Sequence, residues 1–324
     1  MLQEKFGMKK CLSVLLAFIM LAYASLASAA GYPEKPVTVW HPFAPRVSYD
    51  TIGEYYSTEM EKMLGQPFVM KHGLKGEAAR QTLQAPADGY HIFYAGMGPL
   101  ALGPLMEHVD FTLEDFRPIG RVTLLPIVLF AGKNAPFSTY EGFVEYAKAH
   151  PGKVRIAITN KPSSLQIGMT YFIRKHTDLD VQLLEQSSPK EAAEWLLDGR
   201  VDMLLTHPPD AERWVKSGDF VPLATFAGKR LPVYPDVPTM RELGYDWEQT
   251  SWRALMVRRD TPEDVVRILE EASAKIYASE GAQNAVRNWE TIAWMGSEET
   301  EAFLHQEVER YKKMAAELGM LIRR

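Results

Sequence analysis

The stretch from residue 37 to residue 65 reads "VTVWHPFAPRVSYDTIGEYYSTEMEKMLG". Its first part, 37–43, is rich in β-branched and aromatic residues, which is typical of a buried strand. Its last part, 51–64, has the apolar spacing of an amphipathic helix. A polar loop with one arginine lies between the two. We therefore predict a strand, a loop and a helix, which is the repeating unit of an α/β fold.

The same alternation continues along the chain. Further strands are expected at 68–72, 91–96, 127–132, 154–159, 181–185, 201–206, 221–227 and 253–258. Further helices are expected at 76–85, 138–149, 164–176, 189–198, 209–217, 262–279 and 298–318. Strands that alternate with helices predict a mainly parallel sheet covered by helices.

Nine strands are more than one small lobe needs, and two long apolar runs, 120–132 and 251–259, could cross between two lobes. The expected limits are 31–127 with 256–324 for lobe 1, 132–250 for lobe 2, and 128–131 with 251–255 for the hinge crossings. A cleft between hinged lobes is where a ligand would bind.

The N-terminus has the three parts of a secretory signal. Positive charge at 8–10 precedes an apolar core at 11–26, and "ASA" at 27–29 fits a cleavage site for small residues. We predict that residues 1–29 are a cleaved signal peptide and that the protein is exported to the periplasm. The alternative is an uncleaved N-terminal anchor.

Composition excludes several classes of protein. The only cysteine, Cys11, lies in the predicted signal, so the mature chain has no disulfide framework, cysteine nucleophile or cysteine-ligated metal. The formal net charge is −5, and removal of residues 1–29, with three lysines and one glutamate, leaves −7. This balance argues against nucleic-acid binding. No apolar run after residue 30 is long enough for us to expect a transmembrane helix.

Catalytic and cofactor motifs are absent from the sequence. There is no G-x-S-x-G, H-E-x-x-H or Walker pattern, and the eight histidines do not have metal-ligand spacing. "GMGPLA" at 96–101 matches G-x-G-x-x-A, but it follows the third strand and contains Pro99. We interpret it as a strand end whose backbone N–H groups face an anion. We expect no catalytic residue, no metal and no cofactor.

Six polar loops follow predicted strands, at 44–50, 72–78, 95–100, 159–164, 185–189 and 206–210. In open α/β sheets, ligands bind beyond the carboxyl ends of the strands. Backbone N–H groups, hydroxyls and the cations Arg46, Lys75 and Lys161 suit a small carboxylate. The alternative is that these are ordinary polar loops.

Eight stretches in order resemble one family. They are "YPEKPVTVWHPFAPRVSYD", "LGQPFV", "PADGYHI", "DFRPIG", "AKAHPGKV", "LLDGRVDML", "YPDVPTMRELG" and "TPEDVVRILEEA". Together they are similar to the substrate-binding receptors of the tripartite tricarboxylate transporter family, the Bug-type periplasmic solute-binding proteins. The resemblance implies a two-lobed, type II Venus-flytrap fold that captures a small carboxylate and delivers it to a membrane permease.

The ligand loops depart from the family pattern. A first loop like P-F-x-x-G-G-x-x-D becomes "PFAPRVSYD" at 42–50, with Arg46 in the glycine-rich stretch. A second loop like N-R-P-G-A-G-G becomes "KHGLKGE" at 71–77, with Lys75 added. One hypothesis is that Arg46 pairs directly with a carboxylate. The other is that Arg46 faces solvent while Ser48 and backbone amides bind.

The predicted ligand is a small organic anion: a di- or tricarboxylate or an aromatic acid. The predicted ligand-binding residues are Phe43, Ala44, Arg46, Ser48, Tyr49, Asp50, Lys75, Gly76, Gly96, Met97, Gly98, Thr159, Asn160, Ser163, Ser164, Gln166, Ser187 and His207. We expect a monomer with a permease as its partner. Two other classes stay open: a secreted α/β hydrolase or transferase with His207 and Asp210 as acid and base, and a ligand-sensing partner of a signalling protein.

Overall fold

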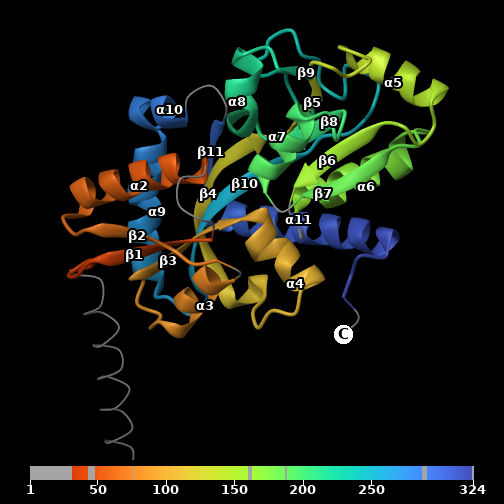
Figure 1. Cartoon of the computed structure of the whole chain (residues 1–324). Coiled ribbons are helices and arrows are strands. Elements are labelled where there is room, and N and C mark those ends of the chain that lie inside the picture. The colour runs from red at the N-terminus through yellow and green to blue at the C-terminus, as the bar shows by residue number, and fades with distance from the viewer. Residues whose placement is uncertain are drawn as a thin grey trace, which may run out of the picture.

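The computed structural model describes residues 31–42, 48–74, 76–159, 163–186, 188–286 and 290–322, with backbone alone for 48–50 and 159. The predicted signal peptide lies outside these ranges. Two β-sheets, each covered by helices, form two lobes (Figure 1). The predicted α/β class is therefore confirmed. No helix in the described ranges is long and apolar enough to cross a membrane.

Lobe 1 is the six-stranded sheet with its helices. Its strand order is β11 (Thr291–Met295), β4 (Phe116–Pro126), β10 (Thr250–Arg258), β3 (His91–Gly96), β1 (Val37–His41) and β2 (Phe68–His72). Its helical elements are α2 (Ser48–Leu64), α3 (Glu77–Gln84), the π-turn η1 (Gly98–Leu102), α4 (Gly103–Met106), the 3₁₀ turn η2 (Leu113–Asp115), α9 (Glu263–Tyr277), α10 (Glu280–Val286) and α11 (Ser297–Leu318).

Lobe 2 is the five-stranded sheet with its helices. Its strand order is β7 (Gln182–Gln186), β6 (Arg155–Thr159), β8 (Met203–Thr206), β5 (Val128–Gly132) and β9 (Phe220–Thr225). Its helices are α5 (Tyr140–Ala149), α6 (Ser164–His176), α7 (Pro189–Leu197) and α8 (Pro208–Lys216).

The expectation of a mainly parallel sheet is wrong. In the described part of the chain, five of the nine strand pairings are antiparallel. Strands joined within a lobe through a helix, such as β1 and β3 or β6 and β8, are parallel, as βαβ units require. Strands β5 and β10 enter their sheets from the other lobe, so no βαβ crossover fixes their direction.

The apolar run 120–132 contains two strands. β4 ends at Pro126 in the first sheet and β5 starts at Val128 in the second, so the chain passes between lobes at Ile127. β10 pairs with β4 from Thr250 opposite Pro126 to Arg258 opposite Phe116. These two strands therefore reach the lobe boundary side by side. The finer lobe limits expected from the sequence stay a proposal.

Several elements were not predicted, and one begins earlier than expected. β4 was expected only as part of the apolar run 120–132, and the short elements η1, α4 and η2 were not expected at all. The edge strand β11 is only half-buried and pairs with β4 alone, so its sequence lacks a strong strand pattern. The short helix α10 follows α9 closely and lies beyond the end of the predicted helix 262–279. α2 begins at Ser48 rather than at residue 51. Asp50 therefore lies inside the first turn, where the helix dipole stabilises an acid.

Helix α11 joins the two lobes. It begins beside β4 in lobe 1 and runs beneath α6 of lobe 2 (Figure 1). Glu317 near its end is 3.3 Å from the Tyr171 hydroxyl and 3.1 Å from Lys175 Nζ, both on α6. On lobe 1, Phe303 packs edge-on against the fully buried Trp252 of β10, with ring centroids 6.1 Å apart. The helix therefore braces the hinge from one side.

Substitution of Gly120 tests the packing of β11 on β4. A Cβ there would overlap the Trp294 ring and the Met295 carbonyl. We expect Gly120→Ala to lower the free energy of unfolding by about 1–3 kcal/mol, since overpacked sites cost that much. Gly103→Ala is the control, because its Cβ would meet its nearest neighbour, Gly98 O, at an ordinary 3.5 Å. Urea denaturation of both variants checks this, and equal midpoints would contradict it.

Candidate ligand cleft at the hinge

The carboxyl ends of the parallel strands meet the hinge. β3 ends at Gly96, which stands opposite Arg253 of β10. β8 of lobe 2 ends at Thr206, and the next residue, His207, bonds to the backbone of β4. Strand ends of both sheets therefore come together at the β4–β10 pair, the position at which α/β proteins bind ligands.

His207 links lobe 2 to both hinge strands. Its Nδ1 lies 2.8 Å from the carbonyl oxygen of Pro126, which can only accept, so Nδ1 carries the proton. Its Nε2 is then an acceptor, 3.4 Å from the Ser251 hydroxyl. Burial lowers the pKa of His207 to about 4. The imidazole is therefore neutral at pH 7 and acts as a hydrogen-bonding group at the hinge.

The N-terminus of α6 lies on the same network. Ser163 caps the helix by accepting from the Gln166 backbone N–H at 3.1 Å. The Ser164 hydroxyl is buried, 3.3 Å from that of Ser251. The Gln166 side chain is buried and donates to the Glu185 carboxylate. Its Oε1 accepts from no group in the described part of the chain. Of these three predicted residues, Ser164 contacts the hinge strand directly, while Ser163 and Gln166 belong to the same helix N-terminus.

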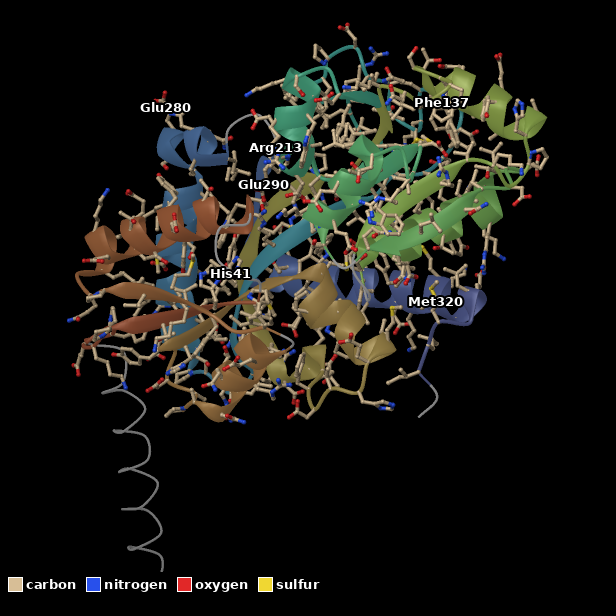
Figure 2. All side chains as sticks on the ribbon, viewed as in Figure 1. His41, Phe137, Arg213, Glu280, Glu290 and Met320 are labelled. Carbon is tan, nitrogen blue, oxygen red and sulfur yellow. The ribbon has the colours of Figure 1, made fainter. Side chains whose placement is uncertain are left out.

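A buried ion pair stands at the centre of the hinge. The Arg253 side chain is fully buried, and its Nη1 is 3.1 Å from Oε2 of Glu290, whose side chain is 7% exposed. The Thr123 hydroxyl donates to Oε1 of the same carboxylate. Burial raises the pKa of Glu290, and the Arg253 charge opposes that rise. Figure 2 shows Glu290 where lobe 1 borders lobe 2.

Sequence analysis did not select Arg253 or Glu290. A signal for Arg253 was present, because it is the one charge inside the apolar stretch "SWRALMV" at 251–257. Such residues are almost never fully buried unless they are paired. No local signal marks Glu290, which comes from a distant part of the chain.

Two histidines close the ends of neighbouring strands. His41 and His72 are the last residues of β1 and β2 and stand opposite each other in the register. Their ring centroids are 5.2 Å apart, and His41 is 5.7 Å from the Tyr94 ring of β3. His41 is fully buried. Sequence analysis considered His41 and His72 only for metal spacing. Their shared position at strand ends was the signal available.

The remaining predicted glycines and Met97 lie at strand ends of lobe 1. Gly76 precedes α3 with φ of 80°, a left-handed conformation that favours glycine. Gly96 closes β3 and Gly98 opens η1. Met97 between them is buried in the apolar core. Their backbone stands at the predicted edge of the sheet.

Several predicted residues lie outside the described ranges. These are Phe43, Ala44, Arg46, Lys75, Asn160 and Ser187. Ser48, Tyr49 and Asp50 are placed by backbone alone in the first turn of α2, and Thr159 is placed by backbone alone at the end of β6. All ten stay predictions as ligand contacts.

The described residues do not pair His207 with Asp210 as acid and base. His207 faces Pro126 and Ser251, whereas Asp210 Oδ2 accepts from the Thr206 hydroxyl at 3.4 Å. Nor do the described residues contain a group of three metal-binding side chains.

A separate groove of about 670 Å³ lies on the α11 side of the hinge. It contains no predicted ligand residue. Its walls come from α6, α11, β4 and the segment before β10, and include Tyr171, Trp247, Phe303 and Arg310. Arg310 bonds to the Glu248 carbonyl and to Glu307, so this groove is part of the brace between the lobes.

The titration of Asp210 gives a pH-dependent prediction. Burial raises its pKa from 3.8 to about 6, so ionisation of Asp210 destabilises the folded state. The protein therefore loses stability as the pH rises from about 4 to about 6, the whole loss is present above about pH 6, and there is none below about pH 4. Asp210→Asn should therefore stabilise the protein by about 1–3 kcal/mol at pH 7.5 and by much less at pH 4. Denaturation at both pH values measures this.

Asp219→Asn is the opposite control. The Lys133 side chain holds the pKa of Asp219 below its usual value, so this half-buried carboxylate favours the folded state when ionised. Its removal should not stabilise the protein at pH 7.5. A stabilisation by Asp210→Asn that is independent of pH would contradict the assignment.

Comparison with known proteins agrees with this architecture. The family model for the tripartite tricarboxylate transporter family receptor matches residues 54–320. Protein BugT of Bordetella pertussis is 26% identical, over 97% of this chain and 98% of its own length.

Two solved structures have the same fold. Rpa4515 of R. palustris, solved with adipate, has a TM-score of 0.79 at 22% identity and covers 89% of this chain and 98% of its own. MatC (Rpa3494) of Rhodopseudomonas palustris, solved with bound malate, has a TM-score of 0.73 at 25% identity and covers 87% of this chain and 99% of its own. The two-lobed binding-protein fold and the resemblance are thus confirmed, and the chain belongs to the tripartite tricarboxylate transporter receptor family of solute-binding proteins.

Proposed function

We propose that this protein is a periplasmic receptor that binds a small organic carboxylate between its lobes and presents it to the membrane permease of a tripartite tricarboxylate transporter. The observation that supports this most is the meeting of strand ends from both sheets at the β4–β10 hinge. MatC, a relative of the same fold, was solved with bound malate. No bond is broken in such a role, and we infer capture without turnover.

The chemistry of the hinge suits an anion. The 13-residue helix α6 starts there, and the N-terminus of a helix carries partial positive charge with free backbone N–H groups. Arg253 supplies a buried cation beside Gly96. Arg46 and Lys75 follow β1 and β2 in the sequence, and we keep them as proposed contacts.

Ligand capture in a two-lobed protein needs contacts from both sides of the hinge. Ser164 and His207 of lobe 2 already meet Ser251 of lobe 1 through contacts of 3.3 and 3.4 Å. A carboxylate that bonds to both lobes would favour the closed arrangement by the difference in its affinity for the two states.

Location and partners complete the proposal. The N-terminal charge, apolar core and small-residue site indicate export by a cleaved signal peptide. We infer a monomer, since one chain supplies both walls of the cleft. The permease is inferred from the family to which the chain belongs.

A thermal-shift screen with malate, citrate and benzoate tests the function. At a hundredfold excess over Kd, a ligand that binds only the folded state adds about 2.7 kcal/mol. For a chain of this size we expect the best acid to raise Tm by roughly 4–8 °C. Mass spectrometry of the recovered acid should show it unchanged. No shift with any acid, or consumption of the acid, would contradict the proposal.

Arg46→Ala tests the first loop. If Arg46 bonds the carboxylate directly, loss of a charge-assisted hydrogen bond should weaken binding by about tenfold or more. Arg200→Ala is the matched control, because Arg200 is an exposed arginine that pairs with Asp198 on the surface. Equal Kd values for the two variants would rule out direct pairing.

A further inference from the structure

We propose that Arg253 receives the carboxylate of the ligand and that Glu290 is an internal carboxylate with which the ligand competes for this guanidinium. The inference rests on the proposed function and deepens it, because it assigns the specificity of the cleft to one buried ion pair. Four properties of the pair support it.

The first property is position. Arg253 stands opposite Gly96, the last residue of β3, two residues after Ser251 on the hinge strand. Its charge acts on His207 and Asp210 of lobe 2, as well as on Glu290 of lobe 1. The guanidinium is therefore within electrostatic reach of side chains from both lobes.

The second property is cost. Arg253 is fully buried on a strand whose neighbours Trp252, Ala254 and Leu255 are also fully buried and apolar. A buried ion pair seldom stabilises a fold more than well-packed apolar residues of similar volume would. Stability alone therefore gives little reason for a charge at this point, whereas recognition of a carboxylate does.

The third property is geometry. A guanidinium binds a carboxylate best through two parallel N–H···O bonds. Glu290 approaches Nη1 through Oε2, while its Oε1 accepts from Thr123. Its two oxygens are thus divided between two partners. A ligand carboxylate that took the place of Glu290 would bring both of its oxygens to the guanidinium.

The fourth property is charge balance. Arg253 and Glu290 together are neutral, so the buried cation is compensated without a ligand. An incoming carboxylate meets the Glu290 charge and must displace it or share the guanidinium with it. Glu290 therefore weakens binding of every carboxylate and selects those with the geometry to replace it.

Three variants separate this role from a structural one: Arg253→Gln, Glu290→Gln and the double variant. Isothermal titration of the exported protein with malate, citrate and benzoate, and with the amide of each, gives the Kd values. For the acid that binds best, Arg253→Gln should weaken binding at least tenfold, because a charge-assisted bond is lost. Glu290→Gln should tighten binding about three- to tenfold for the acid and leave its amide unchanged.

The double variant gives the decisive comparison. It leaves two neutral amides of similar shape and no unpaired buried charge, so its Tm should recover towards that of the wild type. Its affinity for the acid should remain at least tenfold weaker. The matched control is the Arg117→Gln and Glu263→Gln pair, which removes a surface ion pair of lobe 1 with an N–O distance of 2.7 Å. That pair should change no Kd.

The outcomes distinguish the two proposals. If the wild type binds an acid and the double variant binds it equally well, the pair is structural and this inference is overturned, while the proposed function stands. A Glu290→Gln variant with unchanged or weaker acid binding also overturns it. If the wild type binds none of the three acids, the proposed function and this inference fail together.

Discussion

The antiparallel pairing of β4 with β10 is the constraint on which the molecule depends. The chain passes from lobe 1 to lobe 2 just after Pro126 and returns just before Thr250, and these two residues stand opposite each other in the ladder. Both passages therefore start from one hydrogen-bonded ribbon. That ribbon fixes where the sheets meet and which side chains face the boundary. Helix α11 adds a second connection, through Glu317 to α6.

The polar groups on this ribbon connect the lobes through one normal hydrogen bond and two long contacts. His207 has one normal hydrogen bond, to the Pro126 carbonyl at 2.8 Å. The serine contacts that continue from it, at 3.3 and 3.4 Å, are long and therefore weak. A network of this kind orients side chains without locking the lobes together. Because the imidazole is neutral at pH 7, it adds no charge that a ligand would have to offset.

Local patterns predicted the elements, but they could not predict the pairings between distant strands. Periodicity located the first strand and helix, and most of those that followed. It missed β11, because a half-buried edge strand has little apolar pattern. It also missed β4 as a strand of its own, since the apolar run 120–132 continues into β5 without a break, and it missed the antiparallel pairings of β5 and β10. At the site, strand-end loops indicated Ser163, Ser164 and His207, which the structure places at the hinge. Glu290 could not be found in this way, because only the fold brings it to Arg253.

The same ion pair relates the divergent loops to the scaffold. A glycine-rich loop recognises a carboxylate through backbone amides and adds no net charge. This sequence places Arg46 and Lys75 in such loops, and the structure adds a buried arginine at the hinge. A cleft with several uncompensated cations would be costly without a ligand, since like charges repel and desolvation is unfavourable. Glu290 removes that cost for Arg253. Binding then becomes an exchange of one carboxylate for another, and the affinity depends on how much better the ligand fits the guanidinium than Glu290 does.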